Sequence, residues 1–298
     1  MRLLITGGVG QVGEALRRLG PSSDVTVVAP DLDVFDLTKP ETLAIPADID
    51  AVVNSGAYTA VDKAESEPAL AEAINATGAG VLAGLAADRK IPIVQISTDY
   101  VFDGSKTAAY VESDAVNPLS VYGRTKEAGE RLVRAANPRH AVLRTSWVYA
   151  VHGNNFVKTM LRLGRERDQL RVVADQHGAP TYADDIARAI LLVASGLAAG
   201  GPAGTFHFTN AGETTWHSFA CAIWDRAGPK LNRKPAIEAI PTSAYPTQAR
   251  RPMNSRLDCS KIAAAYSVPR RPWSEALDEM LGRLLGACPS DSHGLDRR

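Results

Sequence analysis

Cysteine is scarce in this 298-residue sequence, and the few that occur are scattered. Cys221, Cys259 and Cys288 are odd in number, lie far apart and form no Cys-x-x-Cys pair. Disulfide frameworks and zinc sites need cysteines that are paired in number or closely spaced. The six histidines also contain no His-x-x-x-His pair, the simplest helical metal site. We therefore expect a protein of a reducing compartment with no disulfide framework and no metal site.

An excess of charge of one sign is also missing, because 33 basic side chains balance 33 acidic ones. Proteins that hold nucleic acid or an anionic membrane electrostatically need a basic field, which this composition lacks. The apolar residues before the first glycine-rich turn are too few for a signal peptide, and the longest apolar run, 189–199, is too short to span a membrane. These absences predict a cytoplasmic protein that binds neither nucleic acid nor a membrane.

Short apolar runs alternate with helical patterns through the first two-thirds of the chain. Between the runs, apolar residues recur every three or four positions, as on one face of a helix. Strands that are apolar on both faces and separated by helices are typical of a parallel sheet covered on both sides. The pattern predicts an α/β fold with a doubly wound, Rossmann-type parallel sheet, whose strands are expected at 3–6, 25–28, 51–54, 91–97, 141–146 and 170–174.

The rhythm changes after about residue 199, where a Gly/Pro break is followed by segments rich in proline and basic residues. We predict a dinucleotide-binding domain over 1–150, completed by 170–199. A smaller substrate-binding region is expected over 200–298, with 151–169 contributing, at the carboxyl edge of the sheet where such folds bind ligands. The last eleven residues are expected to fray.

A glycine-rich turn joins the first expected strand to the first expected helix. Gly7, Gly10 and Gly13 have the spacing Gly-x-x-Gly-x-x-Gly, whereas Gly8, Gly10 and Gly13 fit Gly-x-Gly-x-x-Gly, so spacing alone leaves the register open. Glycines allow a tight strand-to-helix turn and let backbone amides approach a pyrophosphate at the helix amino terminus. The strand before the turn and the helix after it favour a dinucleotide-binding loop over a purely structural turn.

In many such folds a carboxylate at the end of the second strand binds the adenosine ribose and so determines the choice of cofactor. Here the strand ends at Pro30, and Asp31 and Asp33 follow, with no arginine nearby in sequence to receive a 2′-phosphate. The acids also fit a solvated loop. The sequence therefore leaves NADH and NADPH as equal alternatives.

A tyrosine opens the helix expected after the fourth strand, and Lys126 follows Tyr122 by four residues, on the same helical face. A nicotinamide hydride reduces a ketone only if an acid protonates the carbonyl oxygen. Lowering the pKa of a tyrosine from ~10 toward neutrality takes about 4 kcal/mol, and a nearby ammonium supplies a large part of that. At the tip of the fourth strand, the Thr98 hydroxyl is placed to orient the carbonyl. The set predicts a reductase with Tyr122 as acid, although the pair alone also fits a surface tyrosine beside a lysine.

These motifs resemble those of an extended short-chain dehydrogenase/reductase, and the chain resembles the dTDP-4-dehydrorhamnose reductase family across nearly its whole length. The resemblance rests on NSGAYTAVDKAESEP, ISTDYVFDG, NPLSVYGRTKEAGE, LRTSWVYA, GNNFVKTMLRL, DQHGAPT, TTWHSFA and AYPTQARRPMNSRLD. It implies NAD(P)H-dependent reduction of the 4-keto group of dTDP-4-dehydro-6-deoxy-L-mannose to dTDP-L-rhamnose, a polysaccharide precursor. The partner is then a nucleotide-sugar substrate, with a homodimer as an open alternative.

The resemblance also implies roles for individual positions. Tyr122 is expected to donate the proton, assisted by Lys126 and Thr98. The residues expected at the cofactor, besides Tyr122, Lys126 and the three glycines, are Gln11 and Val12 at the pyrophosphate, Asp36 and Leu37 on the adenine side, and Ala57, Tyr58 and Thr59 at the nicotinamide half. The residues expected at the substrate are Thr98, Asp99, Trp147, Arg250 and Arg251.

Two departures from the family pattern stand out: Ser55 and Gly56 replace a more usual Ala-Ala pair, and Pro30 stands where an acid often faces the ribose. Competing functions share much of this pattern. They are a reductase or epimerase acting on another nucleotide 4-keto-6-deoxy sugar, and a non-catalytic NAD(P)-binding subunit. A 4,6-dehydratase is disfavoured because Tyr100, after Thr98 and Asp99, takes the place of the second carboxylate that it needs.

Overall fold

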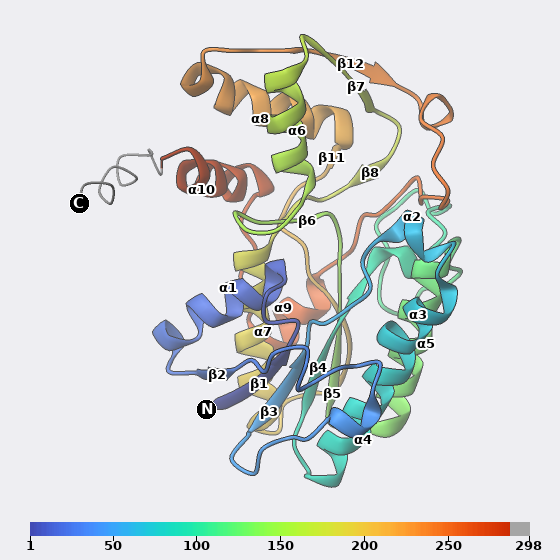
Figure 1. Ribbon diagram of the computed structural model, residues 1–298, viewed down its shortest axis with the longest axis vertical. Helices are drawn as coiled ribbons and strands as arrows, with labels where there is room; N and C mark the ends of the chain where they lie inside the picture. Colours follow the sequence, from blue (N-terminus) through green and yellow to red (C-terminus); the bar gives the residue numbers. More distant parts are fainter. Residues whose placement is uncertain (287–298) are drawn as a thin grey trace, which may run out of the picture.

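Six parallel strands form the central sheet of the computed structural model, which describes residues 1–286 (Figure 1). β1 pairs with both β2 and β3, so the order of the strands reverses beside β1. Open α/β sheets bind ligands at the carboxyl ends of the strands on either side of such a switch point, which here are the loops after β1 and β3. In spatial order the strands are β2 (Thr26–Val28), β1 (Arg2–Thr6), β3 (Ala51–Asn54), β4 (Ile93–Thr98), β5 (His140–Thr145) and β10 (Gly204–His207).

Helices cover both faces of this sheet, which confirms the predicted doubly wound fold. On one face, α1 (Gln11–Leu19) packs against α7 (Ala183–Ala198), and α9 (Ser260–Tyr266) lies beside α7. On the other face, α4 (Ala79–Asp88) packs against α5 (Val121–Ala136). Each layer has its own buried apolar core against the strands. Burial on both faces explains why the strands are apolar without alternation.

The helical segment Pro68–Asp88 is long and apolar enough to cross a membrane by length and composition alone. It comprises α3 (Pro68–Glu72), a π-helical stretch (Ala73–Gly78) and α4. In this fold 44% of its apolar window is buried, and Leu82 belongs to the core between α4 and the sheet. The segment therefore has the packing of a core helix.

A second, smaller body lies beyond the carboxyl edge of the sheet (Figure 1). Trp224, Phe219 and Tyr149 are fully buried in its core. Two short strand pairs lie where the chain passes between the bodies: β6 (Val148–Tyr149) with β9 (Thr181–Tyr182), and β8 (His177–Gly178) with β11 (Thr214–Thr215). The body itself is built from α6 (Phe156–Glu166), α8 (Trp216–Leu231), α10 (Trp273–Gly286) and the parallel strands β7 (Gln169–Val173) and β12 (Ala236–Ile240).

The chain crosses between the two bodies more often than the predicted boundaries imply. β10, which lies within the expected substrate-binding segment, is the edge strand of the central sheet, and Ile262 of α9 belongs to the core on the α7 face. Conversely, Leu170 and Val172 of β7, expected to complete the dinucleotide-binding domain, pack in the core of the second body. A buried strand has the same apolar pattern in either sheet, so composition does not distinguish them. The expected fraying of the last eleven residues, Cys288 among them, lies outside the described residues.

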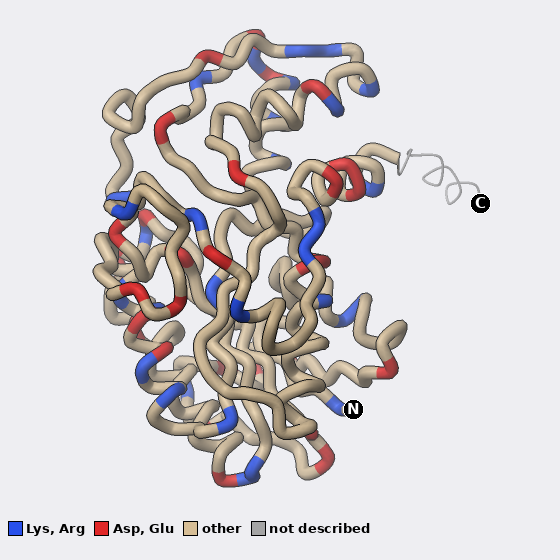
Figure 2. The backbone as a smooth tube through the Cα atoms, turned by 180° about the vertical axis from the view of Figure 1, so that it is seen from behind, with Lys and Arg blue, Asp and Glu red and all other residues tan. Residues whose placement is uncertain are grey.

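The remaining helical elements are short and lie in the connections. They are α2 (Val61–Ala64) and four 3₁₀ turns, η1 (Pro21–Ser23), η2 (Pro40–Thr42), η4 (Asp99–Val101) and η5 (Thr242–Ala244). Seen from behind, basic and acidic residues are intermixed along both bodies (Figure 2). Several of the connections, α2 and η4 among them, bring functional side chains to the boundary between the bodies.

Candidate active site

Tyr122 lies in the first turn of α5, directly against η4. The Ser120 side chain caps the helix by accepting a hydrogen bond from the Gly123 amide at 3.1 Å. A Cβ atom on Gly123 would lie 2.3 Å from the carbonyl oxygen of Tyr100, so only glycine allows this close approach. The rings of Tyr122 and Tyr100 meet edge to face, with their centroids 5.5 Å apart. The local sequence therefore fixes the phenol of Tyr122 beside the tip of β4.

One face of α5 contacts three consecutive residues of β4, which are Ile96, Ser97 and Thr98. Lys126 Nζ donates a hydrogen bond to the Ile96 carbonyl at 2.6 Å, and the Ser97 hydroxyl donates to Glu130 at 2.6 Å. Tyr122 in turn interacts with the Thr98 hydroxyl. Residues 122, 126 and 130 are four apart and share a helical face. The predicted trio of Tyr122, Lys126 and Thr98 is thus brought together, and Glu130 is an additional member.

The pKa of Tyr122 differs from the expectation. Burial raises it to about 12, although the interaction with Thr98 partly opposes this, and the charge of Asp99 raises it further. The predicted net lowering is wrong, because burial outweighs any stabilisation of the phenolate by the Lys126 ammonium, which is directed to the Ile96 carbonyl. Tyr122 is therefore a neutral phenol near pH 7, the form that donates a proton.

Lys126 is almost completely buried, which is unusual for a lysine. Burial lowers its pKa to about 8, and the negative charge of Glu130 partly opposes this effect. The ammonium form predominates at neutral pH, since the pKa still lies above it. Lys126 therefore places a positive charge one helical turn from Tyr122, inside the protein.

Asp99 follows Thr98 and is 2% exposed. Burial raises its pKa to about 6, against hydrogen bonds with Ser255 and Thr98. The Thr98 hydroxyl donates to Asp99 Oδ1 at 3.1 Å, whereas Oδ2 is buried and has no hydrogen-bond partner among the described residues. A buried polar atom left unpaired is costly, so Oδ2 adds to the unfavourable burial of this carboxylate.

The glycine-rich loop after β1 forms a tight cradle. Gly7 has φ +65°, and a Cβ atom there would lie 2.8 Å from the Gly56 amide nitrogen of the loop after β3. A Cβ atom on Gly13 would lie 2.2 Å from the Gly7 carbonyl oxygen. The Gly10 amide donates to the same carbonyl, and α1 begins at the next residue. A Cβ atom on Gly8 would also lie 2.8 Å from the Ala29 Cβ, so the positive φ of Gly7, rather than sterics, favours the register Gly7, Gly10 and Gly13.

The start of α1 provides the groups that bind an anion. Gln11 and Val12 are its first two residues, and backbone amides in a first turn lack intrahelical acceptors. They point outward from the positive end of the helix dipole, as a pyrophosphate site requires. Asn155 Nδ2 donates to the Gln11 side chain at 3.1 Å, which ties the second body to this loop. The residues present therefore fit a dinucleotide.

The predicted nicotinamide loop lies on the other side of the switch point. The Tyr58 amide donates to Asn75 Oδ1 at 2.9 Å, and the Tyr58 hydroxyl donates to Glu67 at 2.7 Å. Tyr58 and Tyr122 pack on the same small apolar cluster, so Ala57 to Thr59 lie near the catalytic candidates. Leu37 packs at Gly56, and the Asp36 carboxylate accepts hydrogen bonds from Thr38 in its own loop.

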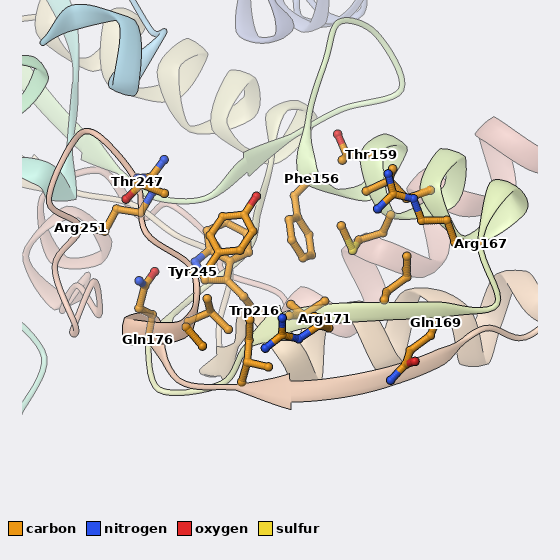
Figure 3. Close-up of a pocket in the computed structure, with 17 residues that line it drawn as sticks. Phe156, Thr159, Arg167, Gln169, Arg171, Gln176, Trp216, Tyr245, Thr247 and Arg251 are labelled. Atoms are coloured by element: carbon orange, nitrogen blue, oxygen red, sulfur yellow. The ribbon is translucent and has the colours of Figure 1, made fainter.

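A cavity of about 570 Å³ opens in the second body (Figure 3). Arg251 and Thr247 lie at one end and Arg167 at the other, with Tyr245 and Trp216 between them. Sequence reasoning assigned a role to only one of the lining residues, Arg251, although Trp216 and Tyr245 lie in the segments TTWHSFA and AYPTQARRPMNSRLD that carry the resemblance. The lining comes from α6, β7, the first residue of α8, β12 and the segment 244–251, which only the fold brings together.

Three residues predicted to bind the substrate lie near the cavity: Trp147, Arg250 and Arg251. Arg251 lines the cavity, and Trp147 contacts Trp216 of the lining. Arg250 is exposed and lies outside the lining. Trp147 follows β5 in the left-handed conformation, with φ +49°, and its ring stacks on Trp216 at 3.7 Å. Such a conformation is strained for tryptophan and persists only where the packing holds it. The charge of Arg251 also acts on Tyr100, which contacts Tyr122, so the cavity and the catalytic candidates adjoin.

Known proteins resemble this chain over nearly its whole length. The family described as RmlD substrate binding domain matches residues 1–285. A dTDP-4-dehydrorhamnose reductase of Sinorhizobium fredii is 43% identical over 291 residues, covering 96% of this chain and 98% of that protein.

Two solved structures also resemble the chain over nearly its whole length. A dTDP-4-dehydrorhamnose reductase of Clostridium acetobutylicum has a TM-score of 0.88 and 38% identity, covering 95% of this chain and 99% of the other. The enzyme of the same name from Bacillus anthracis, solved in complex with NADP, has a TM-score of 0.86 and 33% identity with the same coverage.

Proposed function

The chain belongs to the dTDP-4-dehydrorhamnose reductase family, and we propose that it reduces the 4-keto group of dTDP-4-dehydro-6-deoxy-L-mannose to give dTDP-L-rhamnose, with NADPH or NADH as reductant. The observation that carries this proposal is the position of Tyr122. Its neutral phenol lies against Thr98 at the tip of β4 and shares an apolar cluster with Tyr58, beside the switch point. This position supports the role of proton donor, because the fold binds ligands at that edge of the sheet.

The loops on the two sides of the switch point would hold the cofactor. The amides of Gln11 and Val12 suit the pyrophosphate, and the contacts at Gly7 and Gly13 leave room for no side chain in the cradle. Asp36 and Leu37 are assigned to the adenine side, and Ala57 to Thr59 to the nicotinamide half. When bound, the reduced nicotinamide supplies the hydride.

Tyr122 donates the proton that the substrate oxygen requires. With a pKa of about 12 the phenol is protonated before the reaction, so the donor form is fully populated near neutral pH. The Thr98 hydroxyl, which donates to Asp99 Oδ1 in this structure, would turn its proton to the carbonyl oxygen and orient it beside the phenol. After the transfer a phenolate remains, and the buried ammonium of Lys126 stabilises it electrostatically, because opposite charges interact more strongly where water is excluded.

The second body holds the nucleotide part of the substrate. The cavity is lined by aromatic and apolar side chains with arginines at its ends, as a nucleoside diphosphate requires (Figure 3). Arg251 is assigned to the diphosphate, since guanidinium forks match phosphate oxygens. Trp147, which stacks on Trp216 of the cavity lining, and Asp99, at the tip of β4, are assigned to the sugar ring.

The Tyr122→Phe variant tests the proposal. We expect it to bind NADPH as the wild type does and to lower turnover by ~10²-fold or more, because the proton donor is lost. Turnover is followed as NADPH oxidation with dTDP-4-dehydro-6-deoxy-L-mannose. Tyr149→Phe is the matched control, since its buried hydroxyl has no hydrogen-bond partner among residues 1–286. Turnover by Tyr122→Phe at the wild-type rate would remove the phenol from the mechanism.

The wild-type assay also separates the competing functions. A reductase consumes one NADPH for each sugar reduced, whereas an epimerase restores its cofactor in each cycle and a binding subunit turns over no sugar. Stoichiometric NADPH loss together with formation of dTDP-rhamnose is therefore the expected result. The absence of NADPH loss in a protein that binds both ligands would refute the proposed reduction.

A further inference from the structure

Asp62 and Arg251 form an ion pair at the boundary between the two bodies. Arg251 Nη2 lies 2.7 Å from Asp62 Oδ2, and Nη1 donates to Oδ1 at 3.1 Å. The backbone amide of Ala249 donates to the same Oδ1 at 3.0 Å. The hydrogen bond from Arg251 holds the pKa of Asp62 below its ordinary value, so the carboxylate is charged at neutral pH. Asp62 therefore fixes both the Arg251 side chain and the backbone of its loop.

The hydrogen bonds of Arg251 leave one edge of its guanidinium available. The group has five N–H donors in a rigid plane. Two of them bind Asp62, and Nη1 also donates to the Ala249 carbonyl at 3.1 Å. The Nε–H and the second Nη2–H, which lie on the same edge, make no hydrogen bond to the described residues. Two parallel donors on one edge form the fork that binds two phosphate oxygens.

The side chain of Arg251 lies at one end of the cavity, on the side toward α2 (Figure 3). An unrestrained arginine loses conformational freedom when it binds a ligand, whereas one that is already held loses little. The negative charge of Asp62 would by itself repel a diphosphate, but it is paired with the guanidinium. Orientation is therefore the larger effect of Asp62.

We propose that Asp62 is a positioning residue for substrate binding, which holds Arg251 so that its Nε/Nη2 edge receives the diphosphate of the nucleotide sugar. The inference rests on the proposed function in that it takes a dTDP-sugar as the ligand of the cavity. Asp62 itself need not touch the ligand. Its contribution is a property of ground-state binding, so it should affect KM and leave kcat nearly unchanged.

The test measures binding of dTDP by calorimetry, together with kcat and KM for the nucleotide sugar. We expect Asp62→Asn to weaken dTDP binding about fivefold or more and to raise KM to the same extent, with kcat within about twofold. The matched control is Asp278→Asn, which breaks an aspartate–arginine pair of similar length with Arg226, between α8 and α10. This control should bind dTDP as the wild type does. An unchanged Kd for NADPH and an unchanged Tm show that each variant is folded.

A double-mutant cycle gives a second, independent readout. Asp62→Ala together with Arg251→Ala should bind dTDP no more weakly than Arg251→Ala alone, because Asp62 acts through that side chain. Arg251→Lys keeps the charge but loses the fork, and should also weaken binding. Wild-type or tighter dTDP binding by Asp62→Asn, or additive losses in the cycle, would overturn the proposal. If wild-type protein binds dTDP in an Asp62-dependent way without oxidising NADPH, the proposed reduction fails and this inference stands.

Discussion

Replacing Glu130 by glutamine is expected to destabilise the protein strongly, because Glu130 is the only fully buried carboxylate of the described α5 and compensates a buried arginine. Arg144 Nε and Nη2 donate to its two oxygens at 2.8 and 2.7 Å. Ser97 and Arg134 donate to the same carboxylate. Burial alone would raise the pKa of Glu130, but the hydrogen bonds and the charge of Arg144 outweigh it and hold this pKa below its ordinary value. The group is therefore charged at neutral pH.

The expected loss of stability follows from the groups that lose their partner when glutamine replaces Glu130. Arg144 is 3% exposed and would keep its charge without a counter-ion, while the amide nitrogen would face guanidinium donors. Breaking one partner of a buried ion pair costs about 3–5 kcal/mol. Domains of ordinary stability unfold at a cost of about 5–15 kcal/mol, so this loss is a large fraction of the total. For a chain of 298 residues it corresponds to a fall in Tm of roughly 5–8 °C.

Urea unfolding followed by circular dichroism, at pH 7 and in parallel with wild type, measures this loss. Glu127→Gln is the matched control, because Glu127 lies one turn earlier on α5 and pairs with Arg131, which is largely exposed. The control should lose about 0.5 kcal/mol or less. Replacing both partners, Glu130→Leu with Arg144→Met, should be less damaging than Glu130→Gln, since the buried charge of Arg144 is removed with its partner and Arg134, which also loses its partner, is 34% exposed. A Glu130→Gln variant within about 1 kcal/mol of wild type would refute the assignment of Glu130 as a structural counter-charge.

Two further changes test the cradle and a buried histidine. Gly13→Ala should abolish NADPH binding in a fluorescence titration, because its Cβ would lie 2.2 Å from the Gly7 carbonyl oxygen. The control is Gly84→Ala in α4, whose Cβ would meet nothing within 4 Å and which should bind NADPH as the wild type does. Equal binding by both variants would refute the cradle. His207 is fully buried, and burial, followed by the charge of Arg144, lowers its pKa to about 3. Unfolded histidine takes up a proton below about pH 6.5, whereas the buried ring of folded His207 does not. As the pH falls below that value, wild type should therefore lose stability relative to His207→Gln by up to about 1.4 kcal/mol per pH unit. Urea midpoints between about pH 7 and about pH 5 measure this shift, and a difference independent of pH would contradict the burial of a neutral ring.

The sequence predicts the elements whose signals are local. The apolar runs at 3–6 and 51–54 became β1 and β3, and the glycine spacing between the first run and α1 matches a cradle whose register is indicated by the positive φ of Gly7. The four-residue spacing of Tyr122 and Lys126 places both on the face of α5 that meets β4. Local patterns suffice here because secondary structure, turn geometry and helical periodicity depend on neighbouring residues.

Long-range contacts explain what the sequence did not predict. Lys126 was expected to lower the pKa of Tyr122, but its ammonium is taken up by the Ile96 carbonyl, and burial dominates instead. The pairing of Arg251 with Asp62 joins residues 189 positions apart. The apolar run of β7 carries no sign that its partner is β12 of the second body. In each case the deciding contact comes from a part of the chain that no local pattern identifies.

The same helical face serves both stability and the proposed chemistry, which ties the two together. Tyr122, Lys126 and Glu130 meet Thr98, Ile96 and Ser97, so a shift of α5 by one residue along its axis would unpair a buried lysine and a buried glutamate at once. Two buried charges without partners cost several kcal/mol, so the register of α5 on β4 is held firmly. The distance between the phenol and the Thr98 hydroxyl is then fixed by groups that need not touch the substrate. Placement of a proton donor contributes most to catalysis when it is present before the ligand arrives, and the charge pairing behind Tyr122 would provide that placement for the proposed donor.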